Sequence, residues 1–88
     1  MTETEIRAAV VSGLAQASAF MFRASGIEAA FLKGEADMAI EDIEMDSLSI
    51  MEFCIAIELD TGASILPDEM LQISTLGKLV TAMQKKLA

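Results

Sequence analysis

The side chain best placed for chemistry is the hydroxyl of Ser47, in the tripeptide Asp46-Ser47-Leu48. Asp46 is a candidate N-cap, so a helix is predicted to begin at Ser47. The free N–H groups and the dipole of a helix N-terminus favour an anion, and a phosphodiester on the serine hydroxyl would be well placed there. The sequence contains no His, and the next Lys after Ser47 is Lys78. With no base to activate it, Ser47 is predicted to be a passive attachment point that another enzyme modifies.

No other residues form a recognisable reaction centre. The single cysteine, Cys54, lies between Phe53 and Ile55 and is predicted to be a buried structural thiol. There is no glycine-rich phosphate loop and no spacing typical of metal ligands. The acids from Glu35 to Asp46 lack the EF-hand pattern, so a dedicated calcium site is not predicted. Weak binding of calcium or magnesium to these carboxylates is left open as an alternative function. We therefore predict that the chain is not an enzyme and has no catalytic residue and no dedicated metal site.

The elements that position Ser47 are predicted to be helices. The chain has 88 residues, enough for one small domain over residues 1–88, and it is 53% hydrophobic but only 5% aromatic, with one Pro. This composition favours an all-α fold, which we expect to be a small four-helix bundle of three longer helices and one short one. The predicted helices cover residues 3–23, 47–60 and 67–72, and a last helix starts at Ser74 or Thr75. A connection over residues 24–45 carries a short helical turn near Ile27–Leu32 and is held to the core by Ile40 and Ile43.

The first predicted helix has one apolar face, with spacings of three and four residues. This face comprises Ile6, Val10, Leu14, Ala17 and Met21, and Phe20 and Phe22 are expected to be further apolar anchors. The stretch from Ala8 to Phe22 is too short to span a bilayer, and the acids before it do not suit a secretory signal. We therefore expect a cytoplasmic protein.

The helix predicted after Ser47 is apolar on two faces. On a helical wheel, Ile50, Phe53, Cys54 and Ile57 form the expected core face. The opposite side carries a second apolar stripe, rimmed by acids, which consists of Leu48, Met51, Ile55 and Leu59 with Glu52 and Glu58. Burial of the helix on all sides would leave these carboxylates without water, so an exposed docking surface is the better interpretation.

Charge is distributed unevenly along the sequence. The formal net charge is −8, 11 of the 14 acidic residues lie between Glu35 and Glu69, and no Lys or Arg lies between Gly34 and Gly77. Such a segment would repel nucleic acid and anionic lipid, which bind through Lys and Arg. It would attract proteins that present basic patches. We expect protein partners, with no nucleic acid and no membrane.

These features together resemble the acyl carrier protein family. Asp46-Ser47-Leu48 matches the Asp-Ser-Leu signature of that family. The resemblance is specific from about Ile40 to the C-terminus, and it agrees in order, spacing and acidity. The matching segments are Met51-Glu52-Phe53, Ala56-Ile57-Glu58, Leu66-Pro67-Asp68-Glu69 and Ile73-Ser74-Thr75-Leu76. It implies that a phosphopantetheinyl transferase moves 4′-phosphopantetheine from coenzyme A to Ser47, and that the arm then carries acyl groups as thioesters. The recognition surface implied by the family comprises Asp46, Leu48, Met51, Glu52, Ile55 and Glu58.

The resemblance also implies the biological role. Family members shield the acyl chain between helices, and they deliver it to fatty acid, polyketide or related biosynthetic enzymes with basic docking patches. We expect a monomer. Departures from the family pattern are Glu44 and Met45, where small residues are usual, and Leu59, where an acid is common; they point to a specialised carrier. A carrier of amino acids is a close variant, although Glu44-Met45 replaces the usual Gly-Gly. The main alternative is an acidic helical adaptor that binds basic proteins without a prosthetic group.

Overall fold

The computed structural model describes all 88 residues and confirms the all-α prediction. Its only strand-like feature is an isolated bridge between Ala39 and Thr75. The elements in chain order are α1 (Glu3–Gln16), α2 (Phe20–Ser25), α3 (Glu28–Leu32), the 3-10 helix η1 (Ile40–Ile43), α4 (Ser47–Thr61), α5 (Pro67–Gln72) and α6 (Leu76–Leu87). The expected bundle of three longer helices and one short one corresponds to α1, α4, α6 and α5, to which α2, α3 and η1 are added in the connections.

The first helix is shorter than predicted, because α1 stops at Gln16 and α2 begins at Phe20. Ser18 adopts the left-handed conformation, with φ 57°. The N–H of Ser18 donates to the Ala15 carbonyl and the N–H of Ala19 to the Leu14 carbonyl at 2.9 Å, which is the hydrogen-bond pattern of a Schellman cap. The prediction of one helix over residues 3–23 is therefore wrong at residues 17–19, where a serine takes the position usually held by glycine.

The break in the first helix also changes which apolar residues reach the core. Phe22 is buried, but Phe20 is 74% exposed and Met21 is 44% exposed. The predictions of Met21 on the core face and of Phe20 as an anchor are therefore wrong, because α2 runs in a new direction after Ser18. Phe22 instead meets Phe31 of α3 edge to face, with ring centroids 5.9 Å apart.

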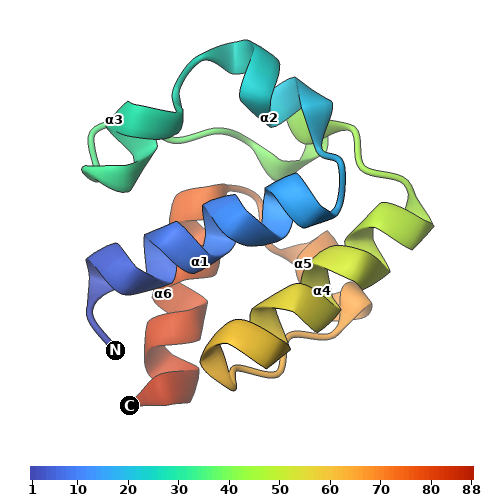
Figure 1. Cartoon of the computed structure of the whole chain (residues 1–88). Coiled ribbons are helices and arrows are strands. Elements are labelled where there is room, and N and C mark those ends of the chain that lie inside the picture. Colours follow the sequence, from blue (N-terminus) through green and yellow to red (C-terminus); the bar gives the residue numbers. More distant parts are fainter.

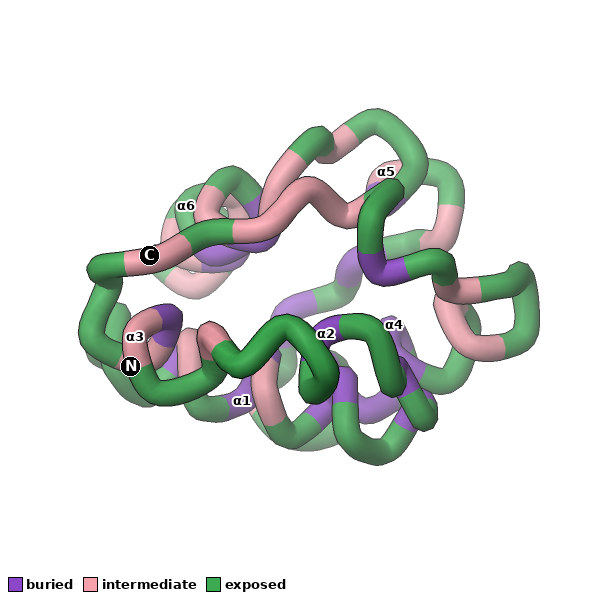
Figure 2. Tube along the Cα trace, turned by 90° about the horizontal axis from the view of Figure 1, so that it is seen from above, coloured by how far each residue is buried: buried purple, intermediate pink, exposed green.

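One hydrophobic core joins the helices. α1 packs against α4, α6 and α3, and α4 packs against α5, so that α2 and α3 lie on one side of α1 and α4 lies on the other (Figure 1). Along α1 and α4, buried and exposed residues alternate within each turn, so that each helix has a buried face and an exposed face (Figure 2). Both termini lie at the same end of the molecule (Figure 1). α1 and α4 approach closely at Gly13, where an added Cβ would lie 3.1 Å from the Phe53 ring.

The connection before α4 is held in place, as the sequence predicted. Ile43 is fully buried, and Ile40 packs against the core. Asp37 accepts a hydrogen bond from the N–H of Gly77 at 2.8 Å, which attaches the connection to the first turn of α6. The Ile40 N–H donates to the Ser74 carbonyl at 2.9 Å beside the Ala39–Thr75 bridge. The long connection therefore delivers the chain to Ser47 along a fixed path.

The helix start and stop signals predicted in the C-terminal half of the chain are present. Gly62 ends α4 in the left-handed conformation, with φ 80°. Pro67 stands in the first turn of α5, and the Thr75 side chain accepts the N–H of Lys78 at the start of α6. None of the helices combines the length and the apolar character needed to cross a lipid bilayer.

Candidate functional site

Ser47 is the first residue of α4, and its side chain is exposed. The Asp46 carboxylate caps the helix, because it accepts the Ser49 N–H at 2.8 Å. This hydrogen bond lowers the pKa of Asp46 below its ordinary value, so the cap is ionised at neutral pH. The predicted N-cap is confirmed, and it presents the serine at the surface of the longest helix of the molecule.

The surroundings of Ser47 fit a group that is attached through an anionic phosphodiester. Backbone N–H groups in the first turn of a helix lack intrahelical acceptors and can point toward an anion. The chain has no His, and the Asp46 carboxylate next to Ser47 accepts the Ser49 N–H as the helix cap. An exposed serine hydroxyl is accessible to a modifying enzyme.

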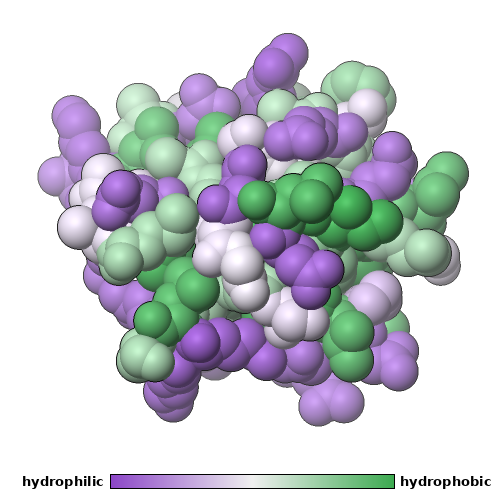
Figure 3. Space-filling view, turned by 60° about the horizontal axis from the view of Figure 1, so that its bottom comes forward, coloured by the Kyte–Doolittle hydropathy of each residue, from purple (hydrophilic) through white to green (hydrophobic).

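The second apolar stripe predicted on α4 is exposed. Leu59 is 82% exposed, Leu48 65%, Ile55 55% and Met51 50%, whereas the opposite residues Phe53 and Ile57 are fully buried. Glu52 and Glu58 are exposed at its edges. The space-filling view shows surface patches of hydrophobic residues bordered by hydrophilic ones (Figure 3). All six residues named from the sequence as a recognition surface are therefore exposed; five lie on α4, and Asp46 is its N-cap.

The apolar surface is wider than the sequence analysis indicated. Leu66, just before α5, is 59% exposed and lies across a shallow cavity of about 160 Å³ from Met51 and Ile55. Leu71 of α5 is 72% exposed. Leu66 occupies the N-cap position of α5 without a side chain that can cap. The sequence signal for this exposed leucine was its position just before Pro67, at an N-cap that usually holds Ser, Thr, Asp or Asn.

Cys54 lies on the core face of α4, as predicted, with 6% of its surface exposed. Burial raises the pKa of the Cys54 thiol, and the nearby Glu69 carboxylate raises it further. The thiol is therefore protonated at neutral pH and has the character of a small core residue.

A groove opens beside the start of α4. It runs between η1 with the following residues on one side and α5 with the α5–α6 connection on the other, and its volume is about 560 Å³. Ile50 lines it one turn after Ser47, and Met45 lines it two residues before Ser47. This volume is within the range of small-molecule sites, and more than half of the lining residues are hydrophobic. The sequence did not reveal this groove, because its walls come from segments separated by about thirty residues.

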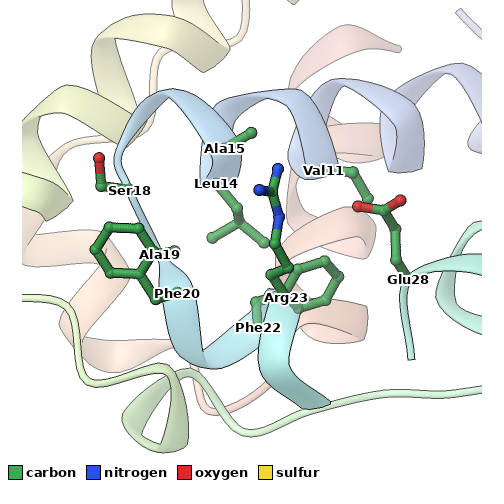
Figure 4. A pocket seen from close by; sticks show the side chains of 9 residues that line it. All are labelled: Val11, Leu14, Ala15, Ser18, Ala19, Phe20, Phe22, Arg23 and Glu28. Atoms are coloured by element: carbon green, nitrogen blue, oxygen red, sulfur yellow. The ribbon is translucent and has the colours of Figure 1, made fainter. Parts of the chain in front are cut away.

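Two smaller cavities lie around the α1–α2 corner. One, which we call the cavity under α2, has a volume of about 180 Å³. It lies between Phe20 and Met21 of α2 and the residues Ile43–Met45 and Ser49. The other holds about 80 Å³ beside Arg23 and Phe22, and its lining includes no residue of α4 (Figure 4). Both are below the usual size of ligand sites. The acids of the connection do not assemble into a metal site, since no group of three or more His, Cys, Asp or Glu side chains could hold an ion.

Comparison with protein families gives one finding. A family model described as a phosphopantetheine attachment site matches residues 25–83, which is more than half of the chain and includes Ser47, α4 and the groove beside them. The comparison with curated proteins and the comparison with solved structures gave no match.

Proposed function

Because the chain belongs to the phosphopantetheine attachment-site family and so is a carrier of that prosthetic group, we propose that Ser47 is the residue that carries the arm. The observation that carries this proposal is the position of Ser47, an exposed serine on the first turn of α4 next to an ionised N-cap. Ser49, the nearest other serine, is half-buried and lines the small cavity under α2. Ser47 also lies within the Asp46-Ser47-Leu48 tripeptide that resembles the signature of acyl carrier proteins.

The prosthetic group supplies a terminal thiol that holds an acyl group as a thioester. The contribution of this chain is to anchor, shield and present that group. The N-terminal turn of α4 would hold the phosphodiester near the positive end of the helix dipole, although its Ser49 N–H already donates to Asp46. The groove lined by Met45, Ile50 and Leu71 offers apolar contacts to an acyl chain attached next to it. The chain itself performs no catalysis in this proposal.

The exposed stripe of α4 is the proposed docking surface for enzymes that load or process the cargo. Its apolar side chains would be covered in such a complex, and Asp46, Glu52 and Glu58 would meet basic groups of the partner. The first such partner is a phosphopantetheinyl transferase, and the others are acyl-processing enzymes of fatty acid, polyketide or related biosynthesis. The shared core of α1, α4 and α6 supports a single carrier domain over residues 1–88, which we propose acts as a monomer in the cytoplasm.

The attachment is tested with two matched serine variants. The chain is incubated with coenzyme A and a phosphopantetheinyl transferase, and the intact mass is measured for the unsubstituted protein, Ser47→Ala and Ser49→Ala. We expect the mass of one phosphopantetheinyl group to appear on the unsubstituted protein and on Ser49→Ala, and to be missing from Ser47→Ala. If Ser47→Ala were modified, or if no protein were modified by a transferase that is active on another carrier, the proposal would be wrong.

The acidic adaptor is the competing function, and the exposed stripe with its carboxylates would serve it equally well. The two functions differ in what Ser47 contributes. A cell-based assay of the pathway that depends on this chain separates them, because an adaptor keeps its full activity with Ser47→Ala, whereas a carrier loses all of it.

A further inference from the structure

Met45 lies between two cavities beside the proposed attachment residue. Its side chain is half-buried, packs against the core and lines both the 560 Å³ groove and the 180 Å³ cavity under α2. Glu44 is the other residue of this segment that lines both. The groove and the cavity under α2 therefore share part of their walls in the short segment that leads into Ser47.

The position of Met45 is fixed from both sides along the chain. Before it, Glu44 ends η1 in the left-handed conformation, with φ 56° and ψ 41°. After it, Asp46 has extended backbone and is held by its cap to Ser49. Ile43, at the end of η1, is fully buried. Met45 thus stands on a backbone that is anchored within two residues in each direction, and its half-buried side chain packs against the core.

We propose that Met45 determines which acyl chains this carrier can shelter, by closing the groove beside Ser47 toward the cavity under α2. This inference rests on the proposed function, in which an acyl chain attached through Ser47 lies in the groove. Acyl carriers that this sequence resembles have small residues just before the attachment tripeptide, so a long side chain here is a particular feature of this chain.

The physical basis is the loss of contact that a chain suffers once it outgrows its apolar site. Each methylene placed in the groove leaves water and stabilises the folded, loaded carrier. Once the acyl chain reaches the Met45 side chain, further methylenes stay in water and add nothing to the stability of the loaded carrier. Truncation of Met45 to alanine removes three side-chain heavy atoms from the wall that the groove shares with the 180 Å³ cavity. We expect the longest chain that can be sheltered to grow as a result.

The test uses the whole chain loaded with straight saturated acyl groups, from acetyl to palmitoyl, by a transferase supplied with the matching acyl-coenzyme A. Intact mass first verifies that each sample carries its acyl arm. The melting temperature of each loaded form is then compared with that of the same variant carrying the arm alone. This difference removes the effect of the substitution on the unloaded protein. The variants are Met45→Ala, the conservative Met45→Leu, and Met38→Ala, a control at a half-buried methionine that packs against the core and lines neither cavity.

We expect the melting temperature of the unsubstituted protein to rise with chain length and then to level off. For Met45→Ala the levelling-off should move to a longer acyl chain, while Met45→Leu and Met38→Ala should level off where the unsubstituted protein does. The same levelling-off length in Met45→Ala and in the unsubstituted protein would overturn the role of Met45 and leave the carrier function intact. A melting temperature independent of chain length in the unsubstituted protein would overturn the sheltering of the acyl chain as well, and failure to load any acyl arm would overturn the proposed function itself.

Discussion

Asp46 links the stability of α4 to the presentation of Ser47. Its carboxylate accepts the Ser49 N–H at 2.8 Å, and this hydrogen bond lowers the pKa of Asp46. In the unfolded chain the same carboxyl has its ordinary, higher pKa and binds a proton first as the pH falls. The ionised cap therefore stabilises the folded state fully above the ordinary pKa, and this contribution is lost as the pH falls through the lowered, folded-state value.

Asp46→Asn tests this linkage, since asparagine can cap the helix and does not titrate. We expect Asp46→Asn to be less stable than the unsubstituted protein at pH 7, because it lacks the charge that favours a helix N-terminus. The difference between the two proteins should shrink when the pH is lowered below about 4. Urea unfolding at several pH values measures the difference, in which the effects of the other carboxylates largely cancel. A difference that stays constant down to pH 2 would contradict the ionised cap.

At the scale of helices, Arg7 connects α1 to α3. Its guanidinium group forms an ion pair with Glu3 at 2.9 Å, donates to the Phe31 carbonyl at 3.0 Å and lies 4.8 Å from the centre of the Phe31 ring. The side chain is only 13% exposed. These contacts depend on the planar, forked shape of arginine, which lysine cannot reproduce.

Arg7→Lys is therefore expected to lower the free energy of unfolding by about 1 to 2 kcal/mol. It should also speed hydrogen exchange in α3 more than in α4, because α3 loses its attachment to α1. Arg23→Lys is the control, since Arg23 is exposed and forms no ion pair. Equal stability of Arg7→Lys and Arg23→Lys would show that the guanidinium contacts do not hold α3.

How far the helices could be predicted depended on whether their ends are encoded locally. The caps at Asp46, Gly62 and Thr75 follow from residue types with strong positional preferences, and all three are confirmed. The end of α1 has no such signal, because Ser18 takes a left-handed conformation that glycine usually supplies and the apolar spacing continues past it. For that reason the sequence wrongly predicts Phe20 as an apolar anchor of the core.

In the candidate site, too, features encoded within one helix could be predicted and features that join distant segments could not. The two faces of α4 could be predicted, because a helical wheel needs only the sequence of one helix, and Leu48 and Ile55 are exposed as expected. The groove could not, because it depends on how η1 and α5 are placed relative to α4. The hydrogen bond from Gly77 to Asp37, which fixes part of that placement, joins residues too far apart in sequence to be recognised as a pair.

At the scale of the whole molecule, charge is separated along the chain and between elements. The bases after Gly34 are all in α6, and Lys86 there is paired with Glu69 at 3.1 Å. α4 carries acids and no base. A partner with a basic patch would therefore be attracted toward the end of the molecule that displays Ser47, and this attraction should weaken with salt.

Charge reversal on α4 tests this attraction. The double variant Glu52→Lys with Glu58→Lys should lower kcat/KM for transfer of phosphopantetheine by roughly tenfold at low salt, and the deficit should narrow as salt is added. The matched control is Glu28→Lys with Glu35→Lys, which makes the same change in net charge away from α4. If kcat/KM fell to the same extent in both double variants, the transfer rate would depend on net charge and not on the position of the acids on α4.

The central claim is that Ser47 carries the prosthetic group, and the most direct measurement is the mass of the protein as isolated from cells that contain a phosphopantetheinyl transferase. Intact mass followed by fragmentation shows whether the group is present and on which residue. We predict an increment of one phosphopantetheinyl group, with or without an acyl cargo, on the peptide that contains Ser47. An unmodified chain from cells in which other carriers are fully modified, or a group attached to any other residue, would contradict the account.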